Sequence, residues 1–130
     1  MNETNYWERI SSSKKDDQGA LEGVRVLDLG EGIAGPFGAT FLADFGADVI
    51  KVEHPDGGDV LRQLPPFSQG ASLWWAVDGR NKKSLTADLS RSEGQDLVRR
   101  LVVVSDVVID SFRPGTLEKW NLGYEELRRA

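Results

Sequence analysis

The first residues whose spacing suggests chemistry are three glycines. They stand at the first, third and last positions of residues 30–35 and satisfy the pattern G-x-G-x-x-G directly after an apolar run, residues 24–29. Glycine lets a ligand approach the backbone, and an acidic residue further on, here Glu53, can hold a ribose in dinucleotide-binding proteins. Pro36 weighs against this interpretation, because a residue inside a helix should donate a hydrogen bond and proline cannot. We therefore expect the helix to begin at Pro36, and the glycines alone leave a nicotinamide or flavin dinucleotide site as one alternative.

Positively charged side chains form a second candidate set, although the chain is acidic overall. Six of them fall in segments that we expect to be loops or strand ends: Arg62, Arg80, Lys82, Lys83, Arg113 and Lys119. Sheets of parallel strands bind ligands at the carboxyl ends of the strands, and several cations gathered there would suit a polyphosphate. For residues 80–83, a solvated run that keeps a loop soluble is an equal alternative. Arg113 directly follows an expected strand, and this position favours a role in ligand binding for Arg113.

The remaining candidates are acid–base groups. His54 is the single histidine and could act as a general base, but a lone histidine at a strand end more often contacts a phosphate or solvent. Carboxylates could support covalent chemistry in principle, yet Asp28 lies inside an apolar strand, where a hydrogen bond to a turn is its expected role. The spacing reveals no nucleophile–base pair. With one histidine and no cysteine, we expect no metal site and no Ser-His-Asp triad.

Alternating strands and helices must position these groups. Residues 24–29 are typical of a strand buried on both faces, and residues 47–52 form the next strand. The helix between them has an apolar face formed at helical spacing by Phe37, Phe41 and Phe45. Gly46 is placed to cap this helix. These elements predict a βαβ unit whose helix begins beside the glycines, a position that suits an anion.

A second unit follows a long irregular segment. Residues 55–83 are punctuated by glycine and proline, so that only a helical turn near residues 73–77 is expected there. Residues 84–89 alternate like a half-buried strand, and Ser90 with Glu93 forms a capping box that opens a helix. The buried stripe of that helix is expected to be Leu97, Val98, Leu101 and Val102. Residues 107–109 form a further buried strand, followed by short helices at 116–120 and from 124 onward. The predicted fold class is α/β, with Rossmann-like βαβ units and a parallel sheet.

The length and composition of the chain exclude several classes of function. The chain has 130 residues, a net charge of -5 and no cysteine. Its length supports one domain, its negative charge argues against nucleic-acid binding, and no apolar run approaches the ~18 residues of a membrane span. Without cysteine, a cytoplasmic location is expected. We expect residues 1–20 to form a flexible polar arm and residues 21–130 the domain, and the last helix carries no stop signal, as if the chain were truncated.

The sequence resembles the N-terminal part of the family III CoA-transferases, the group of formyl-CoA transferase and carnitine CoA-transferase that also includes α-methylacyl-CoA racemase. The matching blocks are residues 21–29 (LEGVRVLDL), 34–36 (AGP), 42–53 (LADFGADVIKVE), 58–59 with Arg62, 81–89 (NKKSLTADL), 93–94, 105–108 (SDVV), 112–115 (FRPG) and 122–124 (LGY) with Leu127. These blocks run in order from residue 21 to the end. The A-G-P turn belongs to this family, which makes the G-x-G-x-x-G pattern incidental.

The resemblance implies a partial large domain that binds coenzyme A as an acyl-CoA substrate. By position, the residues expected at the CoA site are Ile33, Ala34, His54, Ala87, Asp88, Leu89, Ser90, Ser111, Phe112, Arg113 and Lys119. Residues 87–90 would lie along the adenine side, and Lys119 takes the place of a basic phosphate contact. His54 commonly corresponds to an arginine in the family, so phosphate binding there would depend on pH.

The resemblance also implies where the chemistry lies. In the transferases, CoA moves between carboxylic acids through an aspartyl-CoA thioester, and the catalytic aspartate follows the helix that begins at the LGY block. The acid–base pair of the racemases follows it as well. We therefore expect no catalytic residue in this chain and no activity from it alone, and we expect an interlocked homodimer or a second chain that carries the catalytic half. Racemisation of a 2-methylacyl-CoA and a non-catalytic CoA-binding module are the alternatives.

Overall fold

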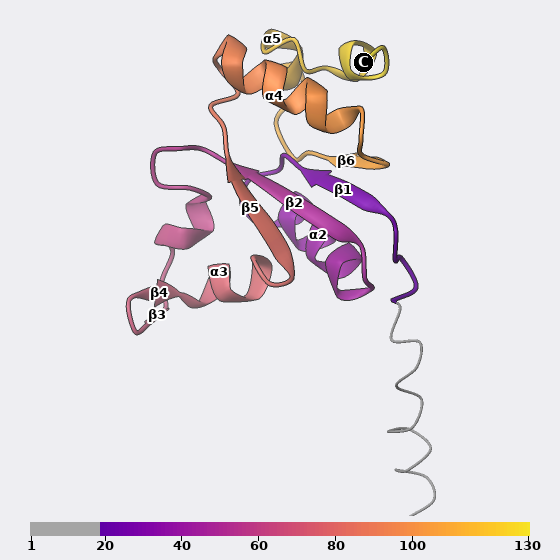
Figure 1. Ribbon diagram of the computed structural model, residues 1–130. Helices are drawn as coiled ribbons and strands as arrows, with labels where there is room; N and C mark the ends of the chain where they lie inside the picture. Colours follow the sequence, from indigo (N-terminus) through magenta and orange to yellow (C-terminus); the bar gives the residue numbers. More distant parts are fainter. Residues whose placement is uncertain (1–18) are drawn as a thin grey trace, which may run out of the picture.

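One sheet of four parallel strands organises residues 19–130, which are the residues that this computed structural model describes. The strands are β1 (Arg25–Asp28), β2 (Asp48–Glu53), β5 (Lys82–Thr86) and β6 (Val107–Ile109), in the order β5-β2-β1-β6 (Figure 1). The chain thus runs outward from β1 to β5 and then crosses back to β6. This order places a topological switch point between β1 and β6, where doubly wound sheets bind ligands at the carboxyl ends of their strands.

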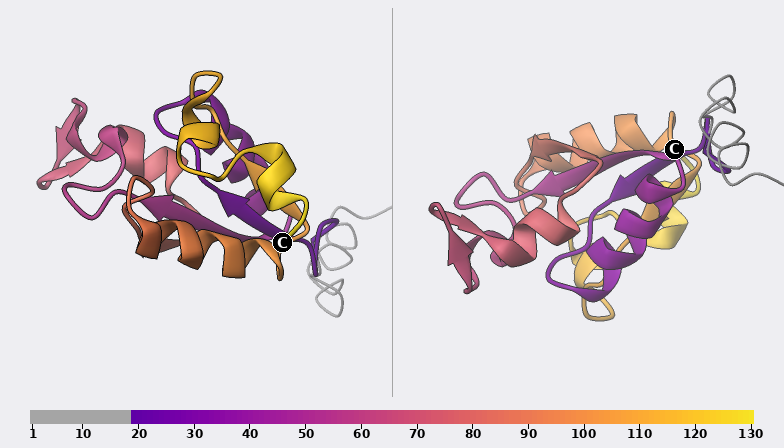
Figure 2. Two further views of the ribbon diagram at one scale, coloured as in Figure 1. Left: turned by 90° about the horizontal axis from the view of Figure 1, so that it is seen from above. Right: turned by 90° about the horizontal axis from the view of Figure 1, so that it is seen from below.

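Helices cover both faces of the sheet, as the views from above and below show (Figure 2). The helix α2 (Ala34–Asp44) packs on one face against Val26 and Val49, and α4 (Ser92–Val102) packs on the other against Leu27 and Val52. The short helices α5 (Thr116–Lys119) and α6 (Tyr124–Leu127) lie on the α4 side, where Leu122 between them is fully buried. The predicted α/β class with a parallel sheet is confirmed.

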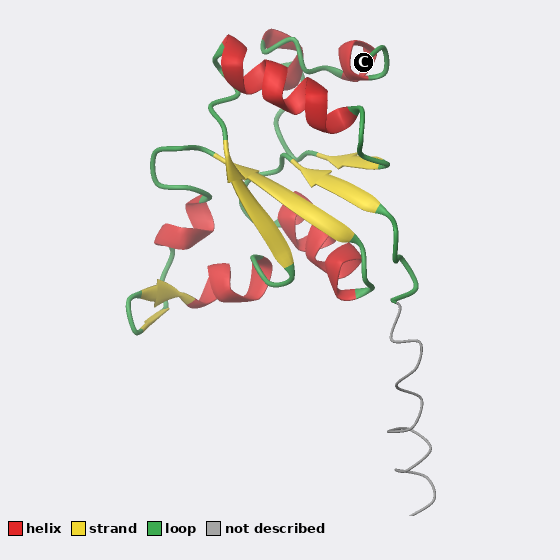
Figure 3. Ribbon diagram, viewed as in Figure 1, coloured by secondary structure: helices red, strands yellow, loops and turns green. Residues whose placement is uncertain are grey.

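The segment between β2 and β5 is more regular than the sequence predicts. It contains a 3₁₀ helix, η1 (Val60–Gln63), an antiparallel hairpin of β3 (Phe67–Ser68) and β4 (Ala71–Ser72), and the helix α3 (Leu73–Asp78) (Figure 3). The expected helical turn is present, but the expectation of irregular chain elsewhere in the segment was wrong. The hairpin forms because its two turn residues, at positions 69 and 70, both take positive φ.

The start of α2 corrects one sequence argument. The helix begins at Ala34, two residues before the predicted start, and its first bond of the helical type runs from the Phe37 N–H to the Ile33 carbonyl at 2.8 Å. Pro36 lies in the first turn, where no N–H needs a partner inside the helix. Gly35 is therefore helical, and Pro36 is no argument against the dinucleotide pattern.

The apolar stripe on α2 does not face the core. Phe37, Phe41 and Phe45 are 37%, 48% and 58% exposed, whereas Ala39 and Ala43 are buried against the sheet. Small side chains let the helix lie close to β1 and β2, so the larger rings take the outer faces. The prediction of the apolar positions was right about helical spacing, but the stripe remains uncovered in the described part of the chain.

Two further expectations fail at α4 and β6. The predicted capping box is absent, because α4 begins at Ser92 and the Ser90 hydroxyl donates instead to Asp88 Oδ1 at 2.6 Å. The buried stripe of α4 is confirmed, with Val98 fully buried. The strand β6, predicted as buried, is one of the two edge strands of the described sheet, and Val107 and Val108 on it are exposed. Among residues 19–130, β6 pairs only with β1.

The predicted flexible arm, residues 1–20, lies outside the described residues except for Gly19 and Ala20. Gly19 packs so closely against the backbone of Gly46 that a side chain would not fit between them. Gly46 itself follows α2 with φ of 99°, as the predicted cap requires.

Candidate functional site

The glycine turn, residues 30–35, joins β1 to α2 at the carboxyl end of the sheet. Ser111, which follows β6, is held against it: the Ser111 hydroxyl accepts from the Glu31 N–H at 3.1 Å and donates to the Glu31 carbonyl at 3.0 Å. A Cβ on Gly30 or on Gly35 would lie 3.0 Å from Ser111 atoms. Two of the three glycines, Gly30 and Gly35, thus allow the turn to lie close to Ser111.

A pocket of about 140 Å³ opens beside this turn, at the carboxyl ends of β1, β2 and β5. Its walls are Leu29, Glu31, Val52, His54, Ala87, Asp88, Leu89, Ser90, Phe112 and Trp120. We call it the strand-end pocket. Six residues that the family resemblance assigns to CoA line it: His54, Ala87, Asp88, Leu89, Ser90 and Phe112. The other five do not line it: Ile33, Ala34, Ser111, Arg113 and Lys119.

Four lining residues were missed from the sequence. Leu29 and Val52 are the last apolar residues of the β1 and β2 runs, a position that could have indicated them. Glu31 comes from the glycine turn. Trp120 reaches the pocket because its ring packs edge-on against Phe112, and no local pattern predicts this contact between residues on either side of α5.

Asp88 is one of two carboxylates that line the strand-end pocket, the other being Glu31. Hydrogen bonds from the Ser90 hydroxyl and the Ser90 N–H lower the pKa of this carboxyl below its ordinary value, so that Asp88 is ionised at neutral pH. His54 Nε2 lies 3.9 Å from Asp88 Oδ1, while His54 Nδ1 accepts the Asp56 N–H at 3.1 Å. An anionic wall of this kind accepts hydrogen bonds from amino and hydroxyl groups and disfavours a phosphate.

A second depression of about 330 Å³ lies on the other side of Asp88 and shares Ala87 and Asp88 with the strand-end pocket. Its far wall belongs to α4. A Cβ on Gly94 would lie 2.1 Å from the Asp88 carbonyl oxygen, so glycine at this position lets α4 touch the loop that carries Asp88. The first turn of α4 therefore fixes the backbone of the carboxylate that both depressions share.

The predicted cluster of six cations is wrong for four of its members. In each case a carboxylate on a neighbouring element neutralises the cation: Arg62 pairs with Glu53, Arg80 with Asp44, Lys82 with Asp28 and Lys83 with Asp48. Arg113 and Lys119 have no ion-pair partner within residues 19–130. These two cations adjoin pocket residues in sequence, Arg113 after Phe112 and Lys119 before Trp120.

Glu53 cannot serve a ribose as the dinucleotide pattern would require. Its two carboxylate oxygens accept from Arg62 at 2.6 and 2.8 Å, from the Ser84 hydroxyl at 2.6 Å and from the Asp59 N–H at 2.9 Å. Burial alone would raise the pKa of Glu53, but these hydrogen bonds outweigh it and lower the pKa to about 2. The side chain is buried and does not line the strand-end pocket.

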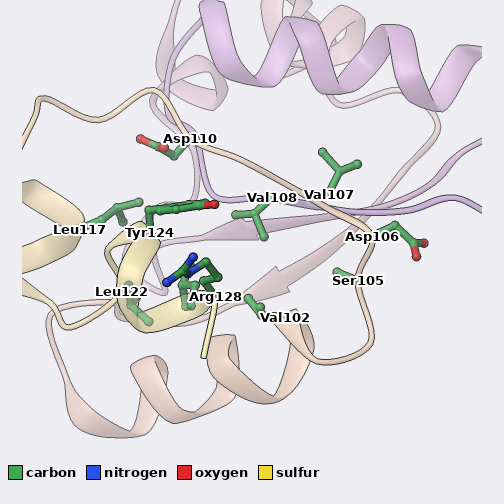
Figure 4. Close-up of a pocket in the computed structure, with 11 residues that line it drawn as sticks. Val102, Ser105, Asp106, Val107, Val108, Asp110, Leu117, Leu122, Tyr124 and Arg128 are labelled. Atoms are coloured by element: carbon green, nitrogen blue, oxygen red, sulfur yellow. The ribbon is translucent and has the colours of Figure 1, made fainter. Parts of the chain in front are cut away.

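A larger pocket of about 340 Å³ lies along the edge strand β6 (Figure 4). Valine and leucine side chains dominate it, together with Tyr124 from α6 and Arg128 directly after that helix. Asp106 and Asp110 flank β6 (Figure 4). None of the residues predicted at the CoA site lines this pocket.

Within residues 19–130 no three side chains of the types His, Cys, Asp or Glu are grouped so that they could hold a metal ion. In the same part of the chain no helix is both long and apolar enough to cross a membrane.

The strand order, with helices on both faces of a parallel sheet, is that of part of a Rossmann-like α/β domain. The family model for CoA-transferase family III matches residues 21–130, and the chain belongs to this family. The resemblance seen in the sequence is thereby confirmed.

Among characterised relatives, the succinyl-CoA:D-citramalate CoA-transferase of Chloroflexus aurantiacus is 57% identical over 108 residues, which are 82% of this chain and 27% of that protein. The succinyl-CoA:L-malate CoA-transferase beta subunit of the same organism is 50% identical over 110 residues, 84% of this chain and 27% of the relative. The crystal structure of a CAIB/BAIF family protein from Brucella suis matches with a TM-score of 0.80 and 42% identity, over 87% of this chain and 31% of that one. The chain thus spans little more than a quarter of the length of these curated relatives.

Proposed function

We propose that this chain supplies the coenzyme A-binding part of an enzyme that moves CoA from an acyl-CoA to a carboxylic acid. The observation that carries the proposal is the strand-end pocket, because it gathers residues 87–90 with His54 and Phe112 at the carboxyl ends of three strands. Sites for small ligands in parallel sheets are expected at this edge. Membership of CoA-transferase family III supports the identity of the ligand.

The size of the pocket limits what it would hold. Its volume of about 140 Å³ lies below the ~300–1,000 Å³ of pockets that enclose a whole drug-sized ligand. We therefore assign it one end of CoA, the adenine and its ribose. Leu29, Val52 and Leu89 offer apolar contact to a base, and Asp88 accepts from an amino or hydroxyl group. Arg113 and Lys119, which have no ion-pair partner in the described part of the chain, are the residues that would meet the phosphates.

The names of the relatives support a substrate class. The two described above are named for succinyl-CoA with D-citramalate and with L-malate, and a third, from Agrobacterium fabrum, is named for succinate and glutarate. We propose succinyl-CoA as the CoA donor and a dicarboxylic acid of similar size as the acceptor. These names favour transfer over racemisation.

The chemical step would use a carboxylate nucleophile. We propose that this group, an aspartate that forms the CoA thioester, lies outside these 130 residues, where the family resemblance puts it. The same polypeptide or a second chain could supply it. A two-chain assembly is supported by the relatives named as alpha and beta subunits of one transferase.

A titration tests the ligand. Binding of CoA to the chain is followed by tryptophan fluorescence, with NAD as the comparison ligand, and Trp120→Phe shows whether the reporter lies in the strand-end pocket. Asp88→Ala is expected to weaken CoA binding, and Asp96→Ala, an exposed carboxylate on α4, is the matched control. Saturable quenching by CoA alone, lost in Asp88→Ala and kept in Asp96→Ala, supports the proposal. A response to NAD alone, or no difference between the two variants, contradicts it.

A further inference from the structure

Beneath the glycine turn lies a buried layer of charged side chains. Within residues 19–130, Lys51 on β2 is the largest fully buried side chain, 1% exposed. Asp28 on β1 and Asp59 before η1 are buried beside it. Lys82 on β5 is buried at its amino group as well. These four residues lie on the α2 side of the sheet, where apolar side chains would normally fill the space between helix and strands. They form the layer that we call the buried charge layer.

The two lysines reach the glycine turn from below. The Lys51 amino group lies 3.1 Å from Asp59 Oδ2 and 3.9 Å from Asp28 Oδ1, and it donates to the Gly30 carbonyl. The Lys82 amino group donates to Asp28 Oδ2 at 3.0 Å and to the Pro36 carbonyl at 2.6 Å. Asp28 also accepts the Gly30 N–H at 3.1 Å. The first residue of the turn and the residue that follows the turn are thus fixed to the buried charge layer.

Charge balance alone does not explain this arrangement. A buried ion pair is often no more stable than apolar residues of the same volume, because removing charges from water is costly. What apolar residues cannot do is donate to main-chain carbonyls. The directed contacts of Lys51 and Lys82 to Gly30 and Pro36 are therefore the distinctive property of the layer.

We propose that Lys51 and Lys82 are positioning residues for the strand-end pocket. They hold the first carbonyl of the turn and the carbonyl of Pro36, while Ser111 holds Glu31 from the other side. Glu31 lines the pocket and Leu29 precedes the turn, so the turn sets one wall of the pocket. Neither lysine lines the pocket itself. The identity of the ligand rests on the proposed function, but the positioning of the turn does not.

Three variants of the chain test the proposal. Lys51→Met and Lys82→Met remove the amino groups and keep most of the side-chain length. Lys83→Met is the matched control, since Lys83 is exposed and its ion-pair partner within residues 19–130 is Asp48, outside the layer. Hydrogen exchange of the amides between Gly30 and Phe37 is measured by mass spectrometry, and CoA affinity by the fluorescence titration.

We expect both layer variants to exchange faster between Gly30 and Phe37 and to bind CoA roughly tenfold more weakly, equivalent to ~1.4 kcal/mol. Lys83→Met should change neither property. Exchange at the turn no faster in Lys51→Met and Lys82→Met than in Lys83→Met would overturn the proposal. If the unaltered chain fails to bind CoA while the layer variants still loosen the turn, the ligand assignment fails and the positioning role stands.

A double variant separates positioning from charge balance and covers a Lys51→Met chain that folds poorly. Lys51→Met with Asp59→Asn removes one charge of each sign, and the asparagine oxygen can still accept the Leu61 N–H that Asp59 accepts at 2.9 Å. We expect the midpoint of thermal unfolding to recover while exchange at the turn remains fast. Recovery of both properties would show a role in stability alone and would overturn the proposal.

Discussion

The ring of Phe112 meets the indole of Trp120 edge-on, with ring centroids 5.3 Å apart and an angle of 85° between the planes. Both rings line the strand-end pocket, and the short helix α5 lies between them in sequence. The pair therefore connects the loop after β6 to the chain after α5 and forms part of the wall of this pocket. Its geometry is the favourable one for two aromatic quadrupoles.

This pair is expected to contribute to stability. Trp120→Leu should lower the free energy of unfolding by about 1 kcal/mol, because the edge-to-face contact is lost while an apolar side chain remains. Trp120→Phe keeps an aromatic ring and should lower the free energy of unfolding by less than Trp120→Leu does. Urea denaturation followed by circular dichroism measures both. Equal losses in the two variants would show that ring geometry contributes nothing.

Glu53 predicts how stability changes in acid. Its pKa in the folded chain, about 2, lies below its ordinary value of 4.5, so its contribution is fully present above pH 4.5 and is lost as the pH falls toward 2. Glu53→Gln should cost about 2–3 kcal/mol at pH 7 and nothing near pH 2. Unfolding curves at a series of pH values provide the measurement. A constant difference between the two proteins across that range would contradict the assignment.

Asp78 predicts a pH dependence of opposite sign. Burial is the main cause that raises the pKa of Asp78 above 3.8, and its Oδ2 atom has no hydrogen-bond partner within residues 19–130. Because the folded state holds this proton more tightly than the unfolded state, stability falls as the pH rises from 3.8 through the raised pKa. Asp78→Asn should therefore increase the free energy of unfolding at pH 7 by about 1 kcal/mol. A thermal melt that moves downward in this variant would refute the prediction.

Two helical glycines should respond in opposite directions to alanine. Gly94→Ala places a Cβ 2.1 Å from the Asp88 carbonyl, so α4 must move, at a cost of about 2–3 kcal/mol. Gly38 lies in α2 with nothing within 4 Å of a Cβ, and Gly38→Ala should gain about 0.5–1 kcal/mol from helix propensity. Gly94→Ala should also weaken CoA binding through Asp88. Chemical denaturation and the CoA titration, run on both variants, give the comparison, and a stable Gly94→Ala chain would show that the contact can relax.

The outer face of α2 should bind apolar probes. Phe41 and Phe45 are exposed, and the Phe41 ring packs edge-on against Phe37 with ring centroids 4.7 Å apart. The chain should enhance the fluorescence of a hydrophobic dye, and Phe41→Gln with Phe45→Gln should reduce that enhancement while changing the free energy of unfolding by only about 0.5 kcal/mol per site. Dye binding that does not depend on these two rings would locate the exposed apolar surface elsewhere.

The sequence predicted the elements better than their surroundings. The apolar run that becomes β1 and the stripe around Val98 were found because strands buried on both faces and amphipathic helices leave periodic signals. The Phe37–Phe45 stripe has the same periodicity yet faces outward, since small residues on another face of α2 pack closer to the sheet. Periodicity identifies a helix, but the partner surfaces decide which face is covered.

The candidate site was predictable where local chemistry defines it. Asp28 was expected to bond a turn, and it accepts the Gly30 N–H. The capping role of Ser90 was wrong because Asp88, two residues earlier, accepts its hydroxyl in a local turn. The cluster around Arg80 was wrong because the fold brings Asp44, distant in sequence, next to Arg80. Lys51 left no signal, because a lysine within an apolar strand cannot be told from a snorkelling surface residue without its neighbours.

The bond between Ser111 and Glu31 joins positions eighty residues apart in the sequence. Contacts of such separation close a long loop, so they form late compared with the local pairing of β1, α2 and β2. During synthesis, the residues of the glycine turn leave the ribosome long before the segment that carries Ser111, Phe112 and Trp120. Pulse-labelled hydrogen exchange should accordingly show protection at Asp48, whose N–H donates to the Val24 carbonyl at 2.8 Å, before protection at Glu31. The strand-end pocket is thus a product of completed folding, and a nascent chain that has formed only its first βαβ unit still lacks the walls that Phe112 and Trp120 provide.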